Sequence, residues 1–167
     1  TMRRDHTVEE YLELIDELKS EVPDVSLTTD IIVGFPGETD SQFQDTLKVM
    51  ERVGYSSSFM FSYSPRPGTP ANEMQDSVPE DVKKQRLQEI IQLQNRLTEE
   101  QGKLYQGKTV EVLIEGNSSR PGYAFKGRNP QYWRVNAKSD TGQFQPGDIV
   151  QVKIEQTSGH GLSGVVQ

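Results

Sequence analysis

Cysteine is absent from the 167-residue sequence. The chain therefore forms no disulfide, and it supplies no thiolate ligand for an iron–sulfur cluster or a zinc ion. No apolar run approaches the roughly 20 residues needed to cross a bilayer, and the first residues lack the apolar core of a signal peptide. These features predict a folded cytoplasmic protein with no membrane partner.

Positive charge is scarce in the first part of the chain and in excess in the second. Residues 1–102 carry 10 Lys and Arg against 20 Asp and Glu, whereas residues 103–167 carry 8 against 5. A change of charge sign along a sequence suggests two modules with different partners. A basic excess is typical of nucleic-acid-binding surfaces, so the second module is the candidate for contact with nucleic acid.

Three helices are predicted in the first module. Thr7 and Glu10 have the spacing of a capping box, and Thr39 and Gln42 repeat it. In such a box two side chains satisfy backbone N–H groups that a helix start leaves unpaired. A third helix is expected to follow Pro79, because apolar residues recur there at helical spacing.

Two strands are predicted between these helices. One ends in Ile31-Ile32-Val33, a β-branched run typical of strands buried on both faces of a parallel sheet, and residues 57–64 alternate between rings and small side chains. The alternation of helices and strands favours parallel strands joined by helical crossovers, as in an α/β barrel or a doubly wound sheet. Two strands cannot form such a sheet independently, so we expect a part of a larger domain.

The hydrophobic period changes to two after Gly102. Five short segments between Val110 and Val166 alternate in this way, and Gly, Pro, Asn and Asp residues separate them. This pattern predicts a small antiparallel β-barrel, the class that includes oligonucleotide-binding folds.

The loop Gly34-Phe35-Pro36-Gly37 follows the first predicted strand and precedes a helix, where an anion can bind. It lacks the Gly-Lys-Ser/Thr ending that brings a lysine to phosphates. Its proline removes a donor, and the acids Asp30 and Glu38 flank it. A phosphate-binding nucleotide enzyme is therefore the weaker interpretation of this loop.

Two segments resemble a known family. TTDIIVGFPGET at residues 28–39 and YSPRPGTPA at residues 63–71 resemble the last two strand-and-loop units of the radical-SAM barrel in methylthiotransferases, and are most similar to the MiaB-type tRNA enzymes. Gly127-Arg128-Asn129 and Pro146-Gly147-Asp148 resemble the TRAM domain, a small RNA-binding β-barrel. Residues 129–136 depart from the usual TRAM pattern.

The resemblance implies a fold of two parts. Residues 1–104 would be the carboxy-terminal part of a radical-SAM α/β barrel, a partial TIM-like barrel made of its last strand-helix units. Residues 105–167 would be the TRAM barrel. The three-cysteine cluster motif and the amino-terminal cluster domain of the family are missing from the sequence.

The resemblance also implies a reaction. S-adenosylmethionine and two [4Fe–4S] clusters would add a methylthio group to C2 of N6-isopentenyladenosine in the anticodon stem-loop of tRNA. Because this chain has no cysteine, the cluster ligands would come from a missing amino-terminal portion, and we expect no catalytic residue and no turnover in this chain alone. The full-length enzyme is expected to be a cytoplasmic monomer.

Two alternatives stay open. One is a sister methylthiotransferase that acts on threonylcarbamoyl-adenosine of tRNA or on an aspartate of a ribosomal protein, since these enzymes share both modules. The other is a non-enzymatic RNA-binding fragment.

The resemblance predicts a cofactor pocket at the carboxyl ends of the two strands, where parallel strands place their ligand loops. Arg66 could bind the carboxylate of S-adenosylmethionine or an RNA phosphate. Asp30 would pair with a neighbour such as Arg66 or face the reaction chamber, and Glu38 is expected to be a helix-start acid rather than a general base. The predicted pocket residues are Gly34, Phe35, Pro36, Gly37, Phe61, Tyr63 and Arg66.

Cations interleaved with aromatic rings predict RNA contacts in the second module, since phosphates attract charge and unpaired bases stack on rings. Some of these rings are expected to fill the barrel core instead. His160, between two glycines, is expected to be a turn residue, and no metal site is predicted. The predicted RNA contacts are Lys126, Arg128, Trp133 and Arg134.

Overall fold

The computed structural model describes residues 5–75, 77–139, 142, 144–159 and 161–167. The chain divides into two compact units, Thr1–Leu97 and Thr98–Gln167. The division falls inside the helix α3, Glu80–Lys103, a few residues before the predicted domain boundary at residue 104. Within the described residues, no helix combines the length and the apolar character needed to span a membrane.

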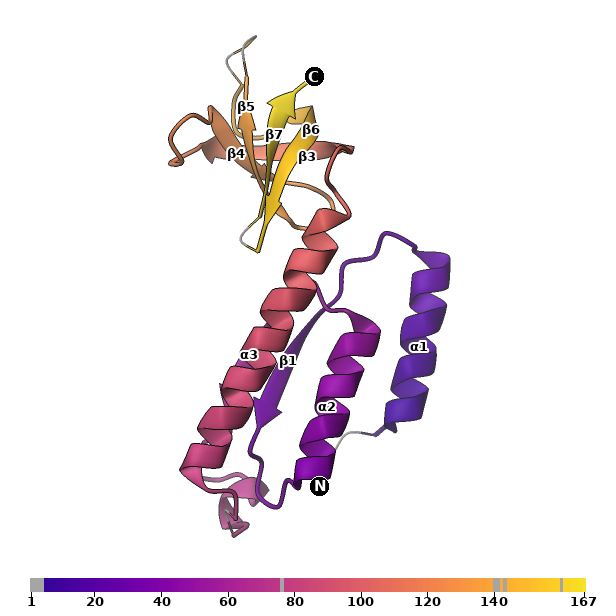
Figure 1. The fold of residues 1–167 in the computed structure, drawn as a ribbon, viewed down its shortest axis with the longest axis vertical. Helices are drawn as coiled ribbons and strands as arrows, with labels where there is room; N and C mark the ends of the chain where they lie inside the picture. Colours follow the sequence, from indigo (N-terminus) through magenta and orange to yellow (C-terminus); the bar gives the residue numbers. More distant parts are fainter. Residues whose placement is uncertain (1–4, 76, 140–141, 143, 160) are drawn as a thin grey trace. The chain divides into compact units, whose positions relative to one another are not determined.

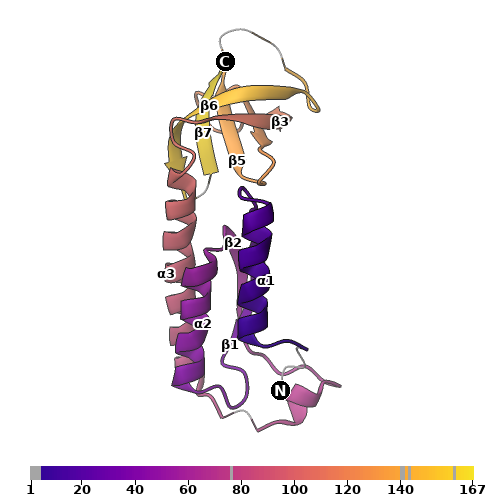
Figure 2. The same cartoon turned by 90° about the vertical axis from the view of Figure 1, so that its right-hand side faces the viewer.

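The first unit is an α/β structure whose two strands pair in parallel, in the predicted order helix, strand, helix, strand, helix. In both ribbon views α2 lies between α1 and α3 (Figures 1 and 2). The predicted α/β class is therefore confirmed for this unit. Its elements are α1 (Val8–Glu21), β1 (Thr28–Val33), α2 (Asp40–Val53), β2 (Ser57–Ser62), a short 3₁₀ helix (Pro70–Glu73) and α3.

Both predicted capping boxes are present. The Thr7 hydroxyl accepts a hydrogen bond from the Glu10 N–H, and the Glu10 carboxylate accepts one from the Thr7 N–H at 2.7 Å. These hydrogen bonds with Thr7 lower the pKa of Glu10. Thr39 and Gln42 make the same pair of bonds at the start of α2. The two helices thus begin where the local sequence satisfies their first backbone donors.

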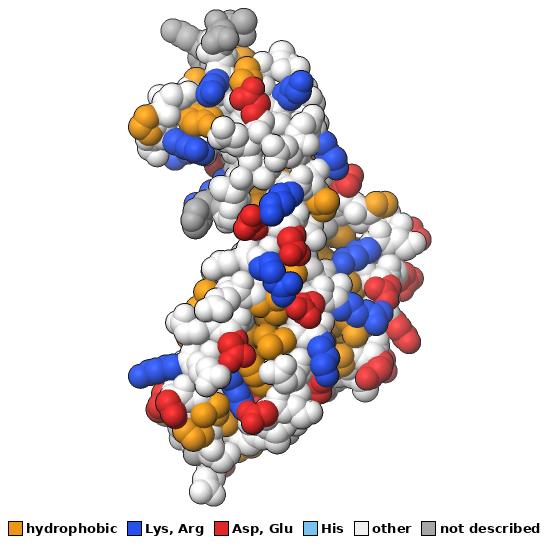
Figure 3. Space-filling model, in the orientation of Figure 1, with side chains coloured by type: hydrophobic (Ala, Val, Ile, Leu, Met, Phe, Trp, Pro, Cys, Tyr) orange, Lys and Arg blue, Asp and Glu red, His pale blue; other side chains and the backbone are white. Residues whose placement is uncertain are grey.

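The surface of α1 that faces solvent is acidic. Its exposed Asp and Glu side chains, red in Figure 3, lie along one edge of the first unit. Such a surface repels RNA phosphates, so nucleic-acid contact is not expected there. These exposed acids are Glu9, Glu10, Glu13, Asp16, Glu17 and Glu21.

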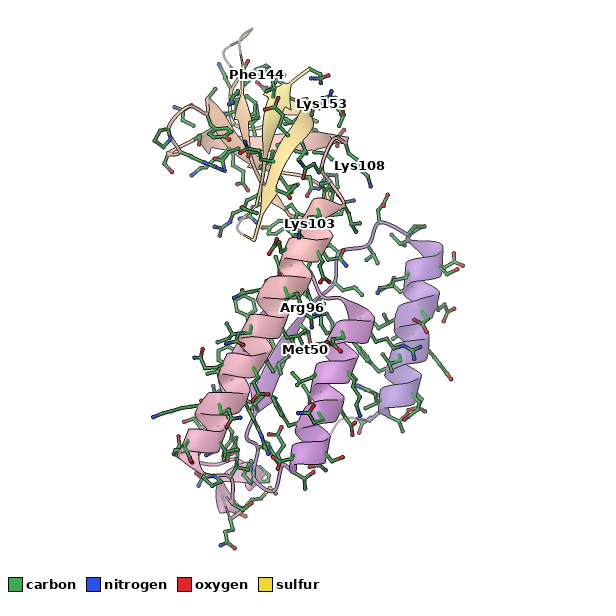
Figure 4. The ribbon with its side chains drawn as sticks, viewed as in Figure 1. Met50, Arg96, Lys103, Lys108, Phe144 and Lys153 are labelled. Carbon is green, nitrogen blue, oxygen red and sulfur yellow. The ribbon has the colours of Figure 1, made fainter. Side chains whose placement is uncertain are left out.

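Only one face of the two-stranded sheet is covered. Ile31 and Val33 of β1 are buried in a core with side chains of all three helices, including Met50, which lies between α2 and α3 (Figure 4). The other face carries Asp30, Ile32, Phe59 and Phe61, which are all exposed, and we call it the open face. Ile32 is 43% exposed, so the predicted burial of β1 on both faces is not met within this chain.

The second unit is a closed barrel with the strand order β3-β4-β5-β7-β6. Among the described residues, four of the five strand pairings are antiparallel, and β5 pairs with β7 in parallel. The predicted small barrel is confirmed, with this one parallel pairing as a correction to its all-antiparallel description. The strands are β3 (Thr109–Asn117), β4 (Phe125–Arg128), β5 (Arg134–Lys138), β6 (Ile149–Ser158) and β7 (Gly161–Val166).

Gly127 lies where β4 crosses close to β3. A Cβ at this position would be 2.1 Å from the Leu113 carbonyl oxygen and 2.8 Å from a Val112 methyl group. Backbone atoms of a closed barrel cannot move aside as a flexible side chain can. The position therefore requires glycine for reasons of space.

We predict that Gly127→Ala lowers the free energy of unfolding of the barrel by about 1–3 kcal/mol, because it overpacks the β3–β4 contact. Urea unfolding monitored by Trp133 fluorescence measures this, since the single tryptophan lies in the barrel. The control is Gly159→Ala, where a Cβ would meet no atom within 4 Å. Equal stability of the two variants would contradict the prediction.

Candidate cofactor loop and nucleic-acid interface

The loop between β1 and α2 folds back on itself. Gly34 and Gly37 have left-handed backbone conformations, with φ of 72° and 82°. The Glu38 N–H donates to the Phe35 carbonyl at 2.8 Å, and the Gly34 N–H donates to the Glu38 carboxylate at 2.7 Å. The two glycines allow this turn because other residues rarely adopt positive φ.

An arginine of α3 holds the Glu38 carboxylate. Arg86 is 5% exposed, and its Nη1 lies 2.6 Å from Glu38 Oε2 while its Nη2 lies 2.5 Å from Asp40 Oδ1. Burial by itself would lower the pKa of Arg86, but the hydrogen bonds with Asp40 and Glu38 outweigh it and raise the pKa. Glu38 thus stabilises the loop by accepting from the Gly34 N–H and pairing with Arg86.

A lysine of α3 packs beneath the same loop. Lys83 is 1% exposed, and a Cβ on Gly34 would lie 2.4 Å from Lys83 Cγ. The Lys83 ammonium lies 2.9 Å from Glu80 and 5.7 Å from the centroid of the Tyr63 ring. Glycine is therefore required at position 34 for two reasons: the Lys83 side chain leaves no room for a Cβ, and the backbone has positive φ.

The sequence analysis missed both Lys83 and Arg86. A signal was present, because Lys83, Arg86, Ile90, Leu93 and Leu97 recur at alternating spacings of three and four, and all five are buried. This spacing places them on one helix face. The two basic residues therefore continue the apolar stripe of α3 rather than its solvent side.

The predicted pocket residues fall into two groups. Gly34 and Pro36 are buried, while Phe35 and Tyr63 are half-buried and their rings meet edge to face at 5.3 Å between centroids. The Tyr63 N–H donates to the Val33 carbonyl at 2.8 Å, which joins the ends of both strands. Gly37, Phe61 and Arg66 are exposed.

Asp30 is exposed on the open face, beside Phe59 of β2 in the strand register. It makes no ion pair within the described part of the chain, so the expected alternative of a pair with Arg66 is not found. An exposed carboxylate needs no partner to offset burial.

The predicted cations of the second unit share one surface of the barrel, which we call the basic face. Lys126 lies opposite Asn136, and Arg128 lies opposite Arg134, across the β4–β5 pairing. Side chains of directly paired residues emerge on the same side of a sheet. Lys126 and Arg134 are exposed, whereas Arg128 forms an ion pair with Glu115 at 2.9 Å.

Trp133 does not belong to this surface. It is 9% exposed and packs in the barrel core, where its ring centroid lies 5.7 Å from that of Tyr105. A buried indole offers no free face to a base, so we leave Trp133 out of the interface proposed below. The exposed ring at this position is its neighbour Tyr132, which is 73% exposed.

The expectation for His160 concerns a residue outside those that the structure describes. Among the residues that the structure describes, no group of three His, Cys, Asp or Glu side chains is arranged to hold a metal ion.

Comparisons with known proteins agree with both units. Residues 1–50 match the Radical SAM superfamily, and residues 103–166 match the TRAM domain. The chain is 43% identical over 165 residues to the tRNA-2-methylthio-N(6)-dimethylallyladenosine synthase of Acetivibrio thermocellus, covering 99% of this chain and 34% of the relative. The synthase of that name from Bacillus velezensis is 46% identical, over 99% of this chain and 32% of the relative. The one from Chlorobaculum tepidum is 48% identical, over 98% of this chain and 36% of the relative.

This chain is similar in sequence to part of each of these synthases. The similarity extends over both units, so it does not rest on the small barrel alone. The chain spans about a third of the length of these relatives.

We predict that Arg86→Met lowers the free energy of unfolding of the first unit by about 3 kcal/mol, because it leaves the Glu38 carboxylate, whose side chain is 11% exposed, without its guanidinium partner. The matched control is Arg52→Met, which removes a 2.7 Å pair with Asp16 whose side chains are both more than half exposed. Such surface pairs contribute about 0–1 kcal/mol. Chemical denaturation monitored by far-UV circular dichroism compares the two, and equal losses would contradict the account of this loop.

Proposed function

We propose that this chain is part of a radical-SAM tRNA methylthiotransferase that adds a methylthio group to C2 of N6-isopentenyladenosine next to the anticodon. The observation that carries the proposal is its 43–48% identity, over 98–99% of its length, to synthases named for the methylthiolation of dimethylallyladenosine in tRNA. The dimethylallyl and isopentenyl names refer to the same substituent.

The open face supports a place inside a larger barrel. In a barrel of parallel strands and helices, the helices cover the outside and the strands direct alternate side chains inward. Here all three helices pack on one side of β1 and β2, and Ile32, Phe59 and Phe61 stay exposed on the other. We propose that a further portion of the enzyme completes the barrel and covers these side chains.

S-adenosylmethionine is proposed to bind at the carboxyl ends of β1 and β2. The Gly34–Gly37 loop offers glycine backbone that a flat adenosine can approach, and the rings of Phe35 and Tyr63 lie beside it. Phe61 and Asp30 lie on the open face, and Arg66 is exposed after β2, where it can meet the cofactor carboxylate.

When bound, S-adenosylmethionine would supply the radical chemistry of the reaction, and the residues around the Gly34–Gly37 loop would hold it. This chain contains no cysteine, so its residues fit the nucleoside part of the cofactor and not the cluster. Its own groups are proposed to position the cofactor, while the ligands of both clusters come from the rest of the enzyme.

The basic face is proposed to bind the anticodon stem-loop of tRNA. Lys126 and Arg134 are exposed, and neither makes an ion pair with another described residue, so both are available to phosphates. Arg128, in contrast, is engaged by the ion pair with Glu115.

The test is to restore the missing portion of the enzyme and to analyse nucleosides from tRNA treated with S-adenosylmethionine, sulfide and a reductant. We expect 2-methylthio-N6-isopentenyladenosine from the longer protein and none from the 167-residue chain, which cannot hold a cluster. A methylthiolated threonylcarbamoyl-adenosine or ribosomal aspartate would instead favour a sister enzyme. Turnover by the chain alone would contradict the assignment of the cluster ligands.

A further inference from the structure

Tyr132 has a backbone conformation that its side chain disfavours. Its φ is 69°, and it is the one non-glycine residue with positive φ among those that the structure describes. L-residues disfavour this region, and for a bulky side chain it is a genuine outlier. Strain of this kind is a reason to look for a function at the residue.

The surrounding loop is built to hold this conformation. Asn129 is 3% exposed, its side-chain oxygen accepts from the Trp133 N–H at 2.8 Å, and its side-chain nitrogen donates to Gln131 at 2.9 Å. The Asn129 carbonyl accepts from the Tyr132 N–H at 2.9 Å. With Trp133 anchored in the core, the loop directs the neighbouring Tyr132 outward, where it is 73% exposed.

Arg128 supports the exposed ring. Its guanidinium carbon lies 4.1 Å from the centroid of the Tyr132 ring, and its Nη1 donates to the Tyr132 carbonyl at 3.3 Å. Glu115 binds Arg128 Nε at 2.9 Å and fixes it from the other side. A cation stacked on one face of a tyrosine orients the ring and leaves the second face free for another planar group.

The charged residues near the ring indicate which kind of planar group can stack on it. Arg134, two residues further on, and Lys126, two residues before Arg128, are exposed cations of the basic face. An exposed ring amid free cations suits single-stranded nucleic acid, in which phosphates need charge and unpaired bases need a flat partner.

We propose that Tyr132 is a stacking platform for an unpaired base of the bound RNA, that Arg128 positions the ring, and that Arg134 and Lys126 contact the adjoining phosphates. This inference rests on the proposed tRNA binding by the basic face. It replaces Trp133 by Tyr132 as the base-contacting ring, and it makes Arg128 a positioning residue rather than a phosphate contact.

The decisive variant is Tyr132→Asn in the 167-residue chain. Asparagine tolerates positive φ better than tyrosine, so we expect the midpoint of unfolding to stay the same or rise. Affinity for an anticodon stem-loop RNA should fall by about 5-fold or more, because base–aromatic stacking contributes at that level. Tyr132→Phe keeps the ring and should bind like the unmodified chain.

Two further readouts separate stacking from charge. A 2-aminopurine in the RNA loop should lose fluorescence on binding the unmodified chain and lose less on binding Tyr132→Asn, because stacking quenches this base. The dependence of affinity on salt should be the same for Tyr132→Asn and the unmodified chain, whereas Arg134→Gln should reduce it by about one phosphate contact.

The outcomes distinguish this inference from the proposed function. If the unmodified chain and Tyr132→Asn bind the RNA equally well while Arg134→Gln binds more weakly, Tyr132 is no platform and RNA binding by the basic face stands. If the unmodified chain does not bind the RNA even at low salt, both fail. Weaker binding by Tyr132→Asn together with a lower unfolding midpoint and weak binding by Tyr132→Phe would assign Tyr132 a structural role and overturn the inference.

Discussion

The buried ion pair between Glu38 and Arg86 joins three segments of the first unit. It links the loop after β1, through the Gly34 N–H, to the start of α2, through Asp40, and to α3, from which Arg86 projects. Apolar packing tolerates small shifts of one helix against another, whereas a buried charge must meet its partner at hydrogen-bond distance. The geometry of the Gly34–Gly37 loop therefore depends on a helix more than forty residues further along the chain.

The two units differ in how their strand edges are paired and how their sheet faces are covered. The second unit closes β3 to β7 into a barrel, which leaves no strand edge without a partner. The first unit has two parallel strands, helices on one side of them and exposed rings on the other. Sheets of this kind are usually covered on both faces, so the exposed face of the first unit fits the proposed larger barrel, whereas the second unit is closed by its own strands. This difference agrees with a chain that spans about a third of its relatives.

The sequence predicted the helices, both capping boxes and the alternation along β2, because these features depend on residues a few positions apart. The prediction from sequence failed where contacts between residues far apart in the chain determine the structure. The spacing of Lys83 and Arg86 places them on the buried face of α3, but nothing local indicates that Gly34 and Glu38, more than forty residues earlier, lie against them. The parallel pairing of β5 with β7 likewise has no local signal. Trp133 could have been assigned to the core, since it alternates in step with Val135 and Ala137, but the positive φ that directs Tyr132 outward could not be predicted.

The central claim is that β1 and β2 are strands of a barrel completed by further polypeptide. Hydrogen–deuterium exchange of the backbone amides of residues 57–62 tests it, with β6 as the internal control, in this chain and in a longer protein that includes the proposed further portion of the barrel. The account predicts much slower exchange in the longer protein for residues 57–62, because the free edge of the sheet gains a partner, and unchanged exchange for β6. Equal exchange of residues 57–62 in the two proteins would contradict it.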